Sequence, residues 1–407
     1  MPSRRDYRLF LAGQTISSLG SSFTTFGLPL LVFRLTGSPT DLALTTIATF
    51  LPYLLFGLLI GAWVDRVDRR RLLIYTTVAS GLTVAVLPTM AACGVLHVWI
   101  VYMVAFVRAS LGIVAHAVEG SAMPSLVSRE RLADANGKLR AGSAAAQVAG
   151  PILAGALIGG GLPIVEVFVV DAVAFWIAAT LLVVVRSPFN RGHSAREPKS
   201  VRSEIVVGLR YVLADPLLRN IALHAALYNL LGSIVTSQLV FFAHDRLGAT
   251  DAQVSVLFGC GAIGTAAALF VSARLRHRLP FAAATLGVMM CWSALILGFS
   301  ASTSFWLGAI LWTVAAGLPT VYAVQTLTFR QLVVPDHLLA RVQTTGQVLA
   351  WSVQPLGAFV GAAIIEATAH IAAVYAGAAL LMALGTAGFW TGPLGKATRP
   401  SSAVSST

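Results

Sequence analysis

Charged side chains are scarce in this chain. Asp, Glu, Lys and Arg make up only 11% of its 407 residues, whereas they make up about 25% of a typical soluble domain. Hydrophobic residues supply 57% of the chain, which exceeds the roughly 45–50% usual in soluble proteins. So few charges could not cover the surface of a water-soluble fold of this size. The composition therefore excludes a soluble globular protein.

Cysteines and nucleotide-binding motifs are also lacking. The chain has three cysteines, all inside or at the ends of apolar runs, so no disulfide framework is expected. No Gly-x4-Gly-Lys-(Ser/Thr) sequence is present to cradle the phosphates of ATP. No Ser/His/Asp set, zinc-ligand spacing or haem motif stands out either. We therefore expect neither an ATP-driven pump nor an enzyme, and we expect no metal and no cofactor.

Long apolar runs recur along the whole chain instead. A run of about 18 or more apolar residues indicates a membrane-spanning helix, and only helices and closed barrels satisfy every backbone polar group in lipid. The runs are too long, and alternate too little between apolar and polar residues, for barrel strands. The sequence therefore predicts an all-α membrane protein with twelve transmembrane helices. The predicted spans are 9–33, 41–64, 72–92, 98–120, 140–161, 163–185, 217–243, 253–273, 280–300, 304–327, 341–365 and 369–392.

The few charges are unevenly distributed between the two sides of the membrane. With twelve spans both termini lie on the same side, and 25 of the 28 Lys and Arg residues fall in segments on that side. Arg34 and Arg246 lie on the other side, and Arg108 lies inside a span. Such a bias follows the positive-inside rule. We therefore expect a multi-pass protein of the cell membrane with cytoplasmic N- and C-termini, and no binding of nucleic acid.

A polar linker divides the chain into two similar halves of six spans each. "LRAGSAAAQVAGPILAGALIGG" (139–160) and "VQTTGQVLAWSVQPLGAFVGAAI" (342–364) superpose with an offset of 204 residues, which aligns Pro151 with Pro355. Internal repeats of this kind are typical of two-lobed secondary transporters. The expected parts are an N-terminal six-helix lobe over 1–186, a cytoplasmic linker with a short amphipathic helix over 187–216, a pseudo-symmetric C-terminal six-helix lobe over 217–395, and a disordered cytoplasmic tail over 396–407.

The most charged segment is the link between the second and third spans. In "GAWVDRVDRRRLL" (61–73), six of the seven residues from Asp65 to Arg71 carry charge. The segment resembles the loop 2–3 signature of the major facilitator superfamily, with Asp68 in place of the usual glycine. The resemblance covers all twelve spans and implies the two-lobed fold of that family. That Asp68 and "LPLLVFRLTGSP" (28–39) also resemble the exporter branch that contains macrolide and siderophore efflux proteins.

The resemblance implies that the loop latches the cytoplasmic gate. A carboxylate at Asp65 would lie near the positive end of the eleventh span's helix dipole, worth roughly 0.3–1 kcal/mol. The alternative is that the loop is only a solvated topology anchor. The gating residues implied are Gly61, Asp65, Arg66, Asp68, Arg69, Arg70 and Arg341.

The fourth span carries several ionisable residues on one stripe. At about 100° per residue, His116 and Glu119 lie within about 80° of Arg108. A charge inside a membrane is costly, so it normally faces a cavity or a partner. Asp171 in the sixth span is a further intramembrane carboxyl group. We predict proton coupling through Arg108, His116, Glu119 and Asp171, with Glu119 favoured as the carrier. A structural salt bridge for Arg108, and a helix-bonding role for Asp171, are the alternatives.

The fifth span contains small residues around a proline. "AQVAGPILAG" (146–155) resembles the span 5 antiporter signature of the superfamily, which implies a hinge and seal biased toward export. Its residues are Gly150, Pro151 and Gly155, and Pro355 is the counterpart in the second half. The alternative is ordinary packing of a kinked helix, because Gly and Pro are common in membrane helices.

In the resembled fold the first, fourth, seventh and tenth spans line the substrate cavity. Polar and aromatic residues on these spans suit a pocket for a medium-sized amphiphile, although small polar residues also join membrane helices. The cavity residues expected are Gln14, Ser18, Ser21, Thr25, His224, Tyr228, Asn229, Gln238, Trp312 and Tyr322.

Together these features predict a secondary active transporter that works by alternating access. We expect proton-coupled efflux of a hydrophobic or amphiphilic small molecule such as a drug, an antibiotic or a secondary metabolite. The expected partners are that small molecule, protons and the lipid bilayer, and the expected state is a monomer. The alternatives are an importer of a small polar nutrient and a non-transporting membrane scaffold.

Overall fold

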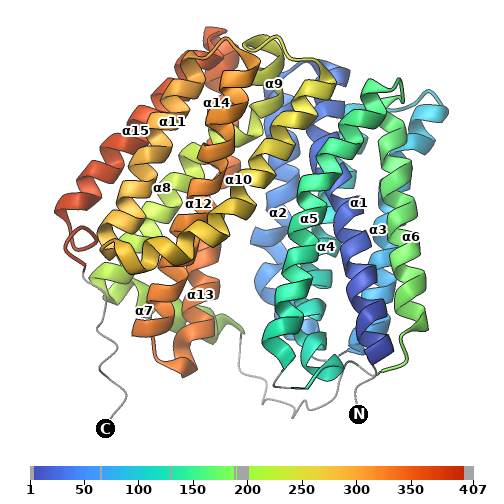
Figure 1. The fold of residues 1–407 in the computed structure, drawn as a ribbon, viewed down its shortest axis with the longest axis horizontal. Helices are drawn as coiled ribbons and strands as arrows, with labels where there is room; N and C mark the ends of the chain where they lie inside the picture. Colours follow the sequence, from blue (N-terminus) through green and yellow to red (C-terminus); the bar gives the residue numbers. More distant parts are fainter. Residues whose placement is uncertain (1–3, 65–66, 129–130, 188, 190–200, 398–407) are drawn as a thin grey trace. The chain divides into compact units, whose positions relative to one another are not determined.

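The computed structural model describes residues 4–64, 67–128, 131–187, 189 and 201–397 (Figure 1). Within these ranges all regular secondary structure is helical. The elements are α1 (Arg4–Thr36), α2 (Pro39–Val64), α3 (Arg69–Ala92), α4 (Val98–Leu126), α5 (Leu132–Gly159), η2 (Ile164–Glu166), α6 (Val167–Val184), α7 (Val201–Ala214), α8 (Pro216–Ser237), α9 (Leu239–Asp245), α10 (Asp251–Arg278), η3 (Ala283–Gly287), α11 (Val288–Ala301), α12 (Phe305–Val333), α13 (Asp336–Trp351), α14 (Gln354–Thr368) and α15 (Ile371–Thr391).

The described residues contain eleven helical spans long and apolar enough to cross a membrane. The bent pair α8 and α9, which meet at 45° around Gln238, makes a twelfth if it is counted as one span. The predicted all-α class with twelve spans is therefore confirmed. One span, Arg341–Thr368, is interrupted where α13 ends at Trp351 and α14 begins at Gln354.

The chain divides into two compact units. Unit 1 comprises residues 1–198 together with 249–259, and unit 2 comprises 199–248 and 260–407. The first residues of α10 thus pack with unit 1, and the remainder of that helix packs with unit 2. An ion pair fixes the start of α10 within unit 1, because Asp251 Oδ2 accepts from Arg34 Nε at 2.8 Å and Nη2 at 2.6 Å.

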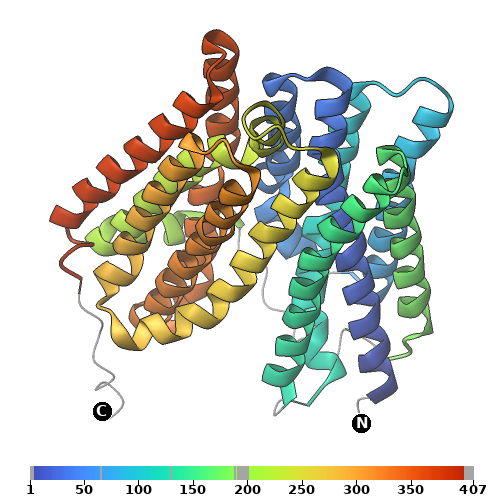
Figure 2. The ribbon, with the colours of Figure 1, turned by 45° about the horizontal axis from the view of Figure 1, so that its top comes forward.

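Within unit 1, α1 packs closely along α6. Gly13, Gly20 and Gly27 recur every seven residues of α1, and each faces α6. A Cβ built on Gly13 would lie 3.4 Å from the carbonyl oxygen of Ala178, and one on Gly27 would lie 3.0 Å from the ring of Phe168. Small residues at helix contacts let backbones approach closely in membranes. Both views of unit 1 show α1 beside α5 and α6 (Figures 1 and 2).

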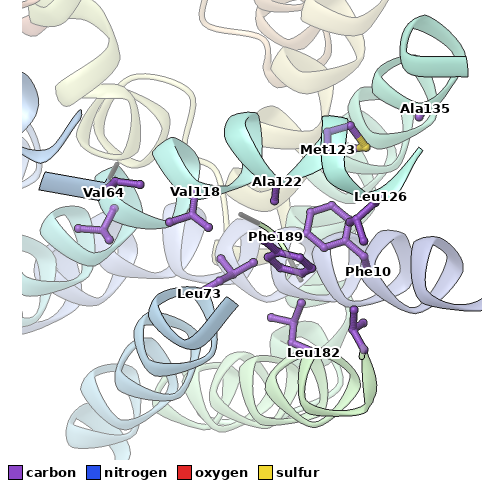
Figure 3. Close-up of a cluster of buried hydrophobic side chains, with 12 residues drawn as sticks. Phe10, Val64, Leu73, Val118, Ala122, Met123, Leu126, Ala135, Leu182 and Phe189 are labelled. Atoms are coloured by element: carbon purple, nitrogen blue, oxygen red, sulfur yellow. The ribbon is translucent and has the colours of Figure 1, made fainter. Parts of the chain in front are cut away.

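An apolar core joins the helices at one end of unit 1 (Figure 3). The rings of Phe10 and Phe189 meet edge to face, with their centroids 5.7 Å apart. The core anchors the six helices α1 to α6 and the chain just after α6 to one another. Its buried members are Phe10, Val64, Leu73, Val114, Val118, Ala122, Met123, Leu126, Ala135, Leu182, Val185 and Phe189.

Unit 2 also relies on glycines at its helix contacts. Gly264 of α10 lies against the backbone of Thr313 in α12, so a side chain there would collide with a carbonyl. A Cβ on Gly361 of α14 would lie 2.7 Å from Ile234 of α8. The linker helix α7 packs on α13 at Gly208, where a Cβ would come within 2.9 Å of the Arg341 carbonyl oxygen.

Candidate functional site

Asp171 is buried at the contact between α1 and α6. Its side chain is fully shielded from solvent, and its Oδ2 accepts a hydrogen bond from the Thr24 hydroxyl of α1. Its Oδ1 accepts no hydrogen bond from the part of the chain that the structure describes. Gly20 lies directly against that oxygen, so a methyl group at position 20 would collide with it. The carboxyl group thus has one satisfied oxygen and one buried oxygen without a donor.

Arg108 of α4 lies near this carboxyl group without pairing to it. Its Nη2 donates to Ser21 Oγ at 2.6 Å, and its guanidinium carbon lies 4.6 Å from the centroid of the Phe175 ring. No ion pair joins Arg108 to Asp171, both of which are described, yet the two are close enough for the charge of one to act on the other. Contacts with α1 and α6 therefore hold a fixed positive charge beside a buried acid.

His116 and Glu119 form a second pair on α4, as their predicted stripe implies. His116 Nδ1 lies 3.3 Å from Glu119 Oε2. The side chain of His116 is 74% exposed and that of Glu119 is 23% exposed. The pair is therefore much more open to water than Asp171 is.

An apolar surface crevice of about 400 Å³ opens on unit 1 between α1, α5 and α6. Gly20 forms part of its wall and also touches Asp171. The lining residues are all apolar: Leu19, Gly20, Phe23, Leu153, Ala156, Leu157, Val170 and Ala174.

The charged loop after α2 serves partly to build unit 1. Asp65 and Arg66 lie outside the described residues, so their predicted gating roles stay predictions. Asp68 caps α3 by accepting from the backbone N–H of Arg71 at 3.0 Å. Arg69 is only 2% exposed.

Arg70 donates to two carbonyl oxygens at the end of α6. Its Nε reaches Val185 O and its Nη2 reaches Val183 O, each at 2.7 Å. Gly61 lies in the last turn of α2 and Arg341 in the first half of α13. The gating roles of Gly61, Arg70 and Arg341 also stay predictions.

The predicted hinge residues differ in their geometry. α5 runs without interruption through Pro151. Gly150 packs against Ser22 of α1, and Gly155 packs against Ser255 of α10 within unit 1. Pro355 instead follows the interruption between α13 and α14. The two aligned prolines therefore occupy different local structures: a continuous helix in the first half and a helix break in the second.

The polar residues predicted to line one face of the first span make different contacts in the structure. Ser18 hydrogen-bonds to Ser143 at 3.0 Å, Ser21 binds Arg108, and Thr25 is exposed with its hydroxyl on the Ser21 carbonyl. Gln14 is only 3% exposed. The stripe joins α1 to α4 and α5 at least as much as it offers groups to a ligand.

Most of the cavity residues predicted in the second half are buried in unit 2. His224, Gln238, Trp312 and Tyr322 are each at most 7% exposed. Nε2 of His224 lies 3.2 Å from Thr386 Oγ1, and Tyr322 donates to the carbonyl of Ile221 at 3.2 Å. In this structure they pack the helices of unit 2 together.

Tyr228 and Asn229 are less enclosed. The ring of Tyr228 meets Trp292 edge to face. Asn229 Oδ1 accepts from Gln354 Nε2 at 2.6 Å, beside the break before α14. Their role in a substrate cavity stays a prediction. Among the described residues, no group of three or more His, Cys, Asp or Glu side chains could hold a metal ion.

Thr24 is the residue of this site that the sequence analysis missed. It lies four residues after Gly20, on the same face of α1. The signal for it was the seven-residue glycine repeat, because a face that carries small residues at regular spacing is the face that a neighbouring helix covers. A hydroxyl on that face was a candidate partner for any acid on the covering helix.

Comparisons with known proteins agree with this architecture. A family model for the Major Facilitator Superfamily matches residues 10–362. Macrolide efflux protein A of Streptococcus pyogenes is 24% identical over 357 residues, which cover 86% of this chain and 87% of that protein. Multidrug efflux pump Tap of Mycolicibacterium fortuitum is 27% identical over 381 residues, covering 88% and 89%.

Solved structures show the same fold at low identity. A bacterial homologue of the human lysosomal transporter Spinster superposes with a TM-score of 0.70, is 16% identical and covers 95% of both chains. The nucleoside transporter NupG superposes with a TM-score of 0.75 at 12% identity, covering 95% of this chain and all of that one. At such identities the likeness extends to the fold alone.

Proposed function

The chain belongs to the major facilitator superfamily, and from that premise we propose that it exports a hydrophobic or amphiphilic small molecule in exchange for protons. Membership of that family and the membrane-spanning helices make it a multi-pass membrane transporter rather than an enzyme. The direction, the substrate class and the coupling ion belong to the proposal. A drug, an antibiotic or a secondary metabolite is the kind of substrate we expect.

The observation that carries proton coupling is the environment of Asp171. A lone charged carboxylate buried away from water is costly unless it is paired or hydrogen-bonded. Here Thr24 donates one hydrogen bond and the charge of Arg108 acts from nearby, which supports the ionised form. The free Oδ1 can carry a proton without breaking any hydrogen bond present in the structure. Both states are therefore accessible to the same side chain.

Glu119 fits the role of carrier less well, although span 4 was the expected site. Its side chain is 23% exposed and already contacts His116. A carboxyl group in contact with water exchanges protons without any change in the transporter, so it couples weakly to movement. Arg108 remains charged at accessible pH and can tune Asp171 but cannot carry the proton. We therefore assign the proton carrier to Asp171.

Export of a hydrophobic compound draws support from the relatives and from one feature of unit 1. Two relatives are named for efflux, of macrolides and of multiple drugs. The crevice between α1, α5 and α6 is apolar throughout, so its lining would favour contact with an apolar molecule. We place the protein in the cell membrane as a monomer with cytoplasmic termini, and Asp65 and Arg341 at a cytoplasmic gate.

The proposal can be tested with inverted membrane vesicles that take up a radiolabelled macrolide under an imposed pH gradient. We expect gradient-driven accumulation by the wild type and its loss in Asp171→Asn. The same variant should still exchange labelled for unlabelled compound at equilibrium, because exchange needs no net proton movement. Glu119→Gln is the matched control and should keep most of the gradient dependence.

Two results would count against this assignment. Accumulation that persists after the pH gradient and the membrane potential are both collapsed would exclude proton coupling. Gradient dependence that survives in Asp171→Asn but disappears in Glu119→Gln would move the carrier to α4. A compound panel measured in an efflux-deficient host then tests the substrate class separately.

A further inference from the structure

The last turn of α12 contains Arg330, whose side chain contacts α13 within unit 2. The apolar run predicted a span over 304–327, which left Arg330 outside, but the structure continues the helix and the candidate span to Val333. The guanidinium lies across the backbone of Gly346 in α13. A Cβ built on Gly346 would lie 3.2 Å from Nη1, 3.3 Å from Cζ and 3.4 Å from Nη2. Three nearly equal distances mean that the flat face of the guanidinium covers the glycine.

The side chain of Arg330 reaches from α12 across to α13. Arg330 is partly buried, and only residues 334 and 335 join the two helices. An arginine that snorkels would instead extend away from neighbouring helices, toward the membrane surface.

No described residue neutralises this charge. Elsewhere Arg34 pairs with Asp251 and Arg70 binds two carbonyls, but Arg330 makes no side-chain hydrogen bond or ion pair with any residue that the structure describes. Unit 2 also has few acids to offer. Its acidic residues are Glu204 in α7, Asp215 at the start of α8, and Asp245, Asp336 and Glu366 at or near the ends of later helices.

We propose that Arg330, seated on Gly346, is a binding site for an oxyanion such as a carboxylate, sulfonate or phosphate group. A guanidinium presents a planar fork of N–H donors that matches two oxygens of such a group. Gly346 covers one face of the guanidinium, so the N–H edge is the part left for a ligand. A charge inside a membrane protein normally has a partner, and an anionic ligand supplies the one that unit 2 lacks. The site does not depend on the direction of transport or on protons.

Two kinds of molecule carry this chemistry: an acidic solute that is transported, and a phospholipid with a phosphate in its headgroup. The test has an arm for each. Thermal unfolding of the purified full-length protein is followed by tryptophan fluorescence in dodecyl maltoside, with sodium phosphate or with sodium chloride of equal ionic strength. The second arm uses nanodiscs of phosphatidylcholine with or without phosphatidylglycerol.

We expect the wild-type Tm to rise by about 2 °C or more in at least one arm, because a ligand that binds only the folded state stabilises it. Arg330→Gln should lose the rise. Arg278→Gln should keep it, since it removes the same charge from an exposed position at the end of α10. A response to phosphate identifies a soluble anion, and a response to phosphatidylglycerol alone identifies a lipid.

Gly346→Ala provides a variant that keeps the arginine. The added methyl group would press on the guanidinium at 3.2–3.4 Å, so the rise in Tm should shrink although the charge is unchanged. If Arg330→Gln does not fold, Gly346→Ala still tests the proposal. The proposal fails if the wild type responds in neither arm, or if Arg330→Gln or Gly346→Ala responds as fully as the wild type.

Discussion

Gly20 shows how a residue without a side chain can determine the surroundings of a buried acid. It lines the apolar crevice, and a Cβ at this position would collide with Asp171 Oδ1. Asp171 and Arg108 were predictable because a charge inside an apolar run is conspicuous. Thr24 was missed although the glycine repeat marked its face of α1, because apolar runs alone do not show how two helices are rotated about their axes.

The prediction at this scale concerns Gly20→Ala. The methyl group would collide with Asp171 Oδ1 and lie 3.0 Å from the Ala174 Cβ. Overpacking of this kind costs about 1–3 kcal/mol, so we expect a lower free energy of unfolding in a sodium dodecyl sulfate titration. Gly13→Ala is the matched control on the same face, since its methyl group would make an ordinary 3.4 Å contact. Equal stability of the two variants would contradict the close approach at Asp171.

At the scale of the helices, the sequence predicts spans better than it predicts their ends and breaks. Apolar runs continue through the bend between α8 and α9, so hydropathy gives no sign of it, whereas Pro355 did mark the break before α14. The end of the tenth span was placed at 327, and the helix continues to Val333. The reason is that polar residues near an end can be covered by neighbouring helices, which composition alone does not reveal.

The C-terminal end of helix α6 allows a test of how a neighbouring side chain stabilises a helix end. The last carbonyls of a helix need donors from elsewhere, and Arg70 supplies two hydrogen bonds to Val183 and Val185. Hydrogen bonds from charged groups contribute about 1.5–3 kcal/mol each when well shielded and less when exposed. We expect Arg70→Gln to lower the Tm of the purified protein, with Arg71→Gln as the control because the Arg71 side chain is 74% exposed. If both variants unfold alike, Arg70 does not cap α6.

At the scale of the whole molecule, the uneven distribution of Lys and Arg between the two sides of the membrane predicts how the protein is oriented in it. Of 28 Lys and Arg residues, 25 lie in segments expected on the cytoplasmic side. In a background with its three cysteines changed to serine, Thr303→Cys before α12 should react with a membrane-impermeant maleimide in intact cells. Lys138→Cys in α5 should react only after the cells are opened. Both positions are exposed, so the reverse pattern would mean an inverted topology.

The sequence could not foresee which residues would pack together across the middle of the chain. Equal span counts and the offset of 204 residues predict a division at the linker. The structure nevertheless groups residues 249–259 with unit 1. That grouping depends on contacts such as Gly155 with Ser255 and Arg34 with Asp251, which join positions far apart in sequence and leave no periodic signal.

This grouping limits how the protein can recombine with its relatives. A gene fused at the linker would combine one parent's α1–α6 with another parent's α10, and the start of that α10 would have to fit a foreign surface. The ion pair and the small-residue contact would both have to be present in the hybrid. Exchanging residues 249–259 together with the first half should therefore give more viable chimeras than cutting at the linker alone.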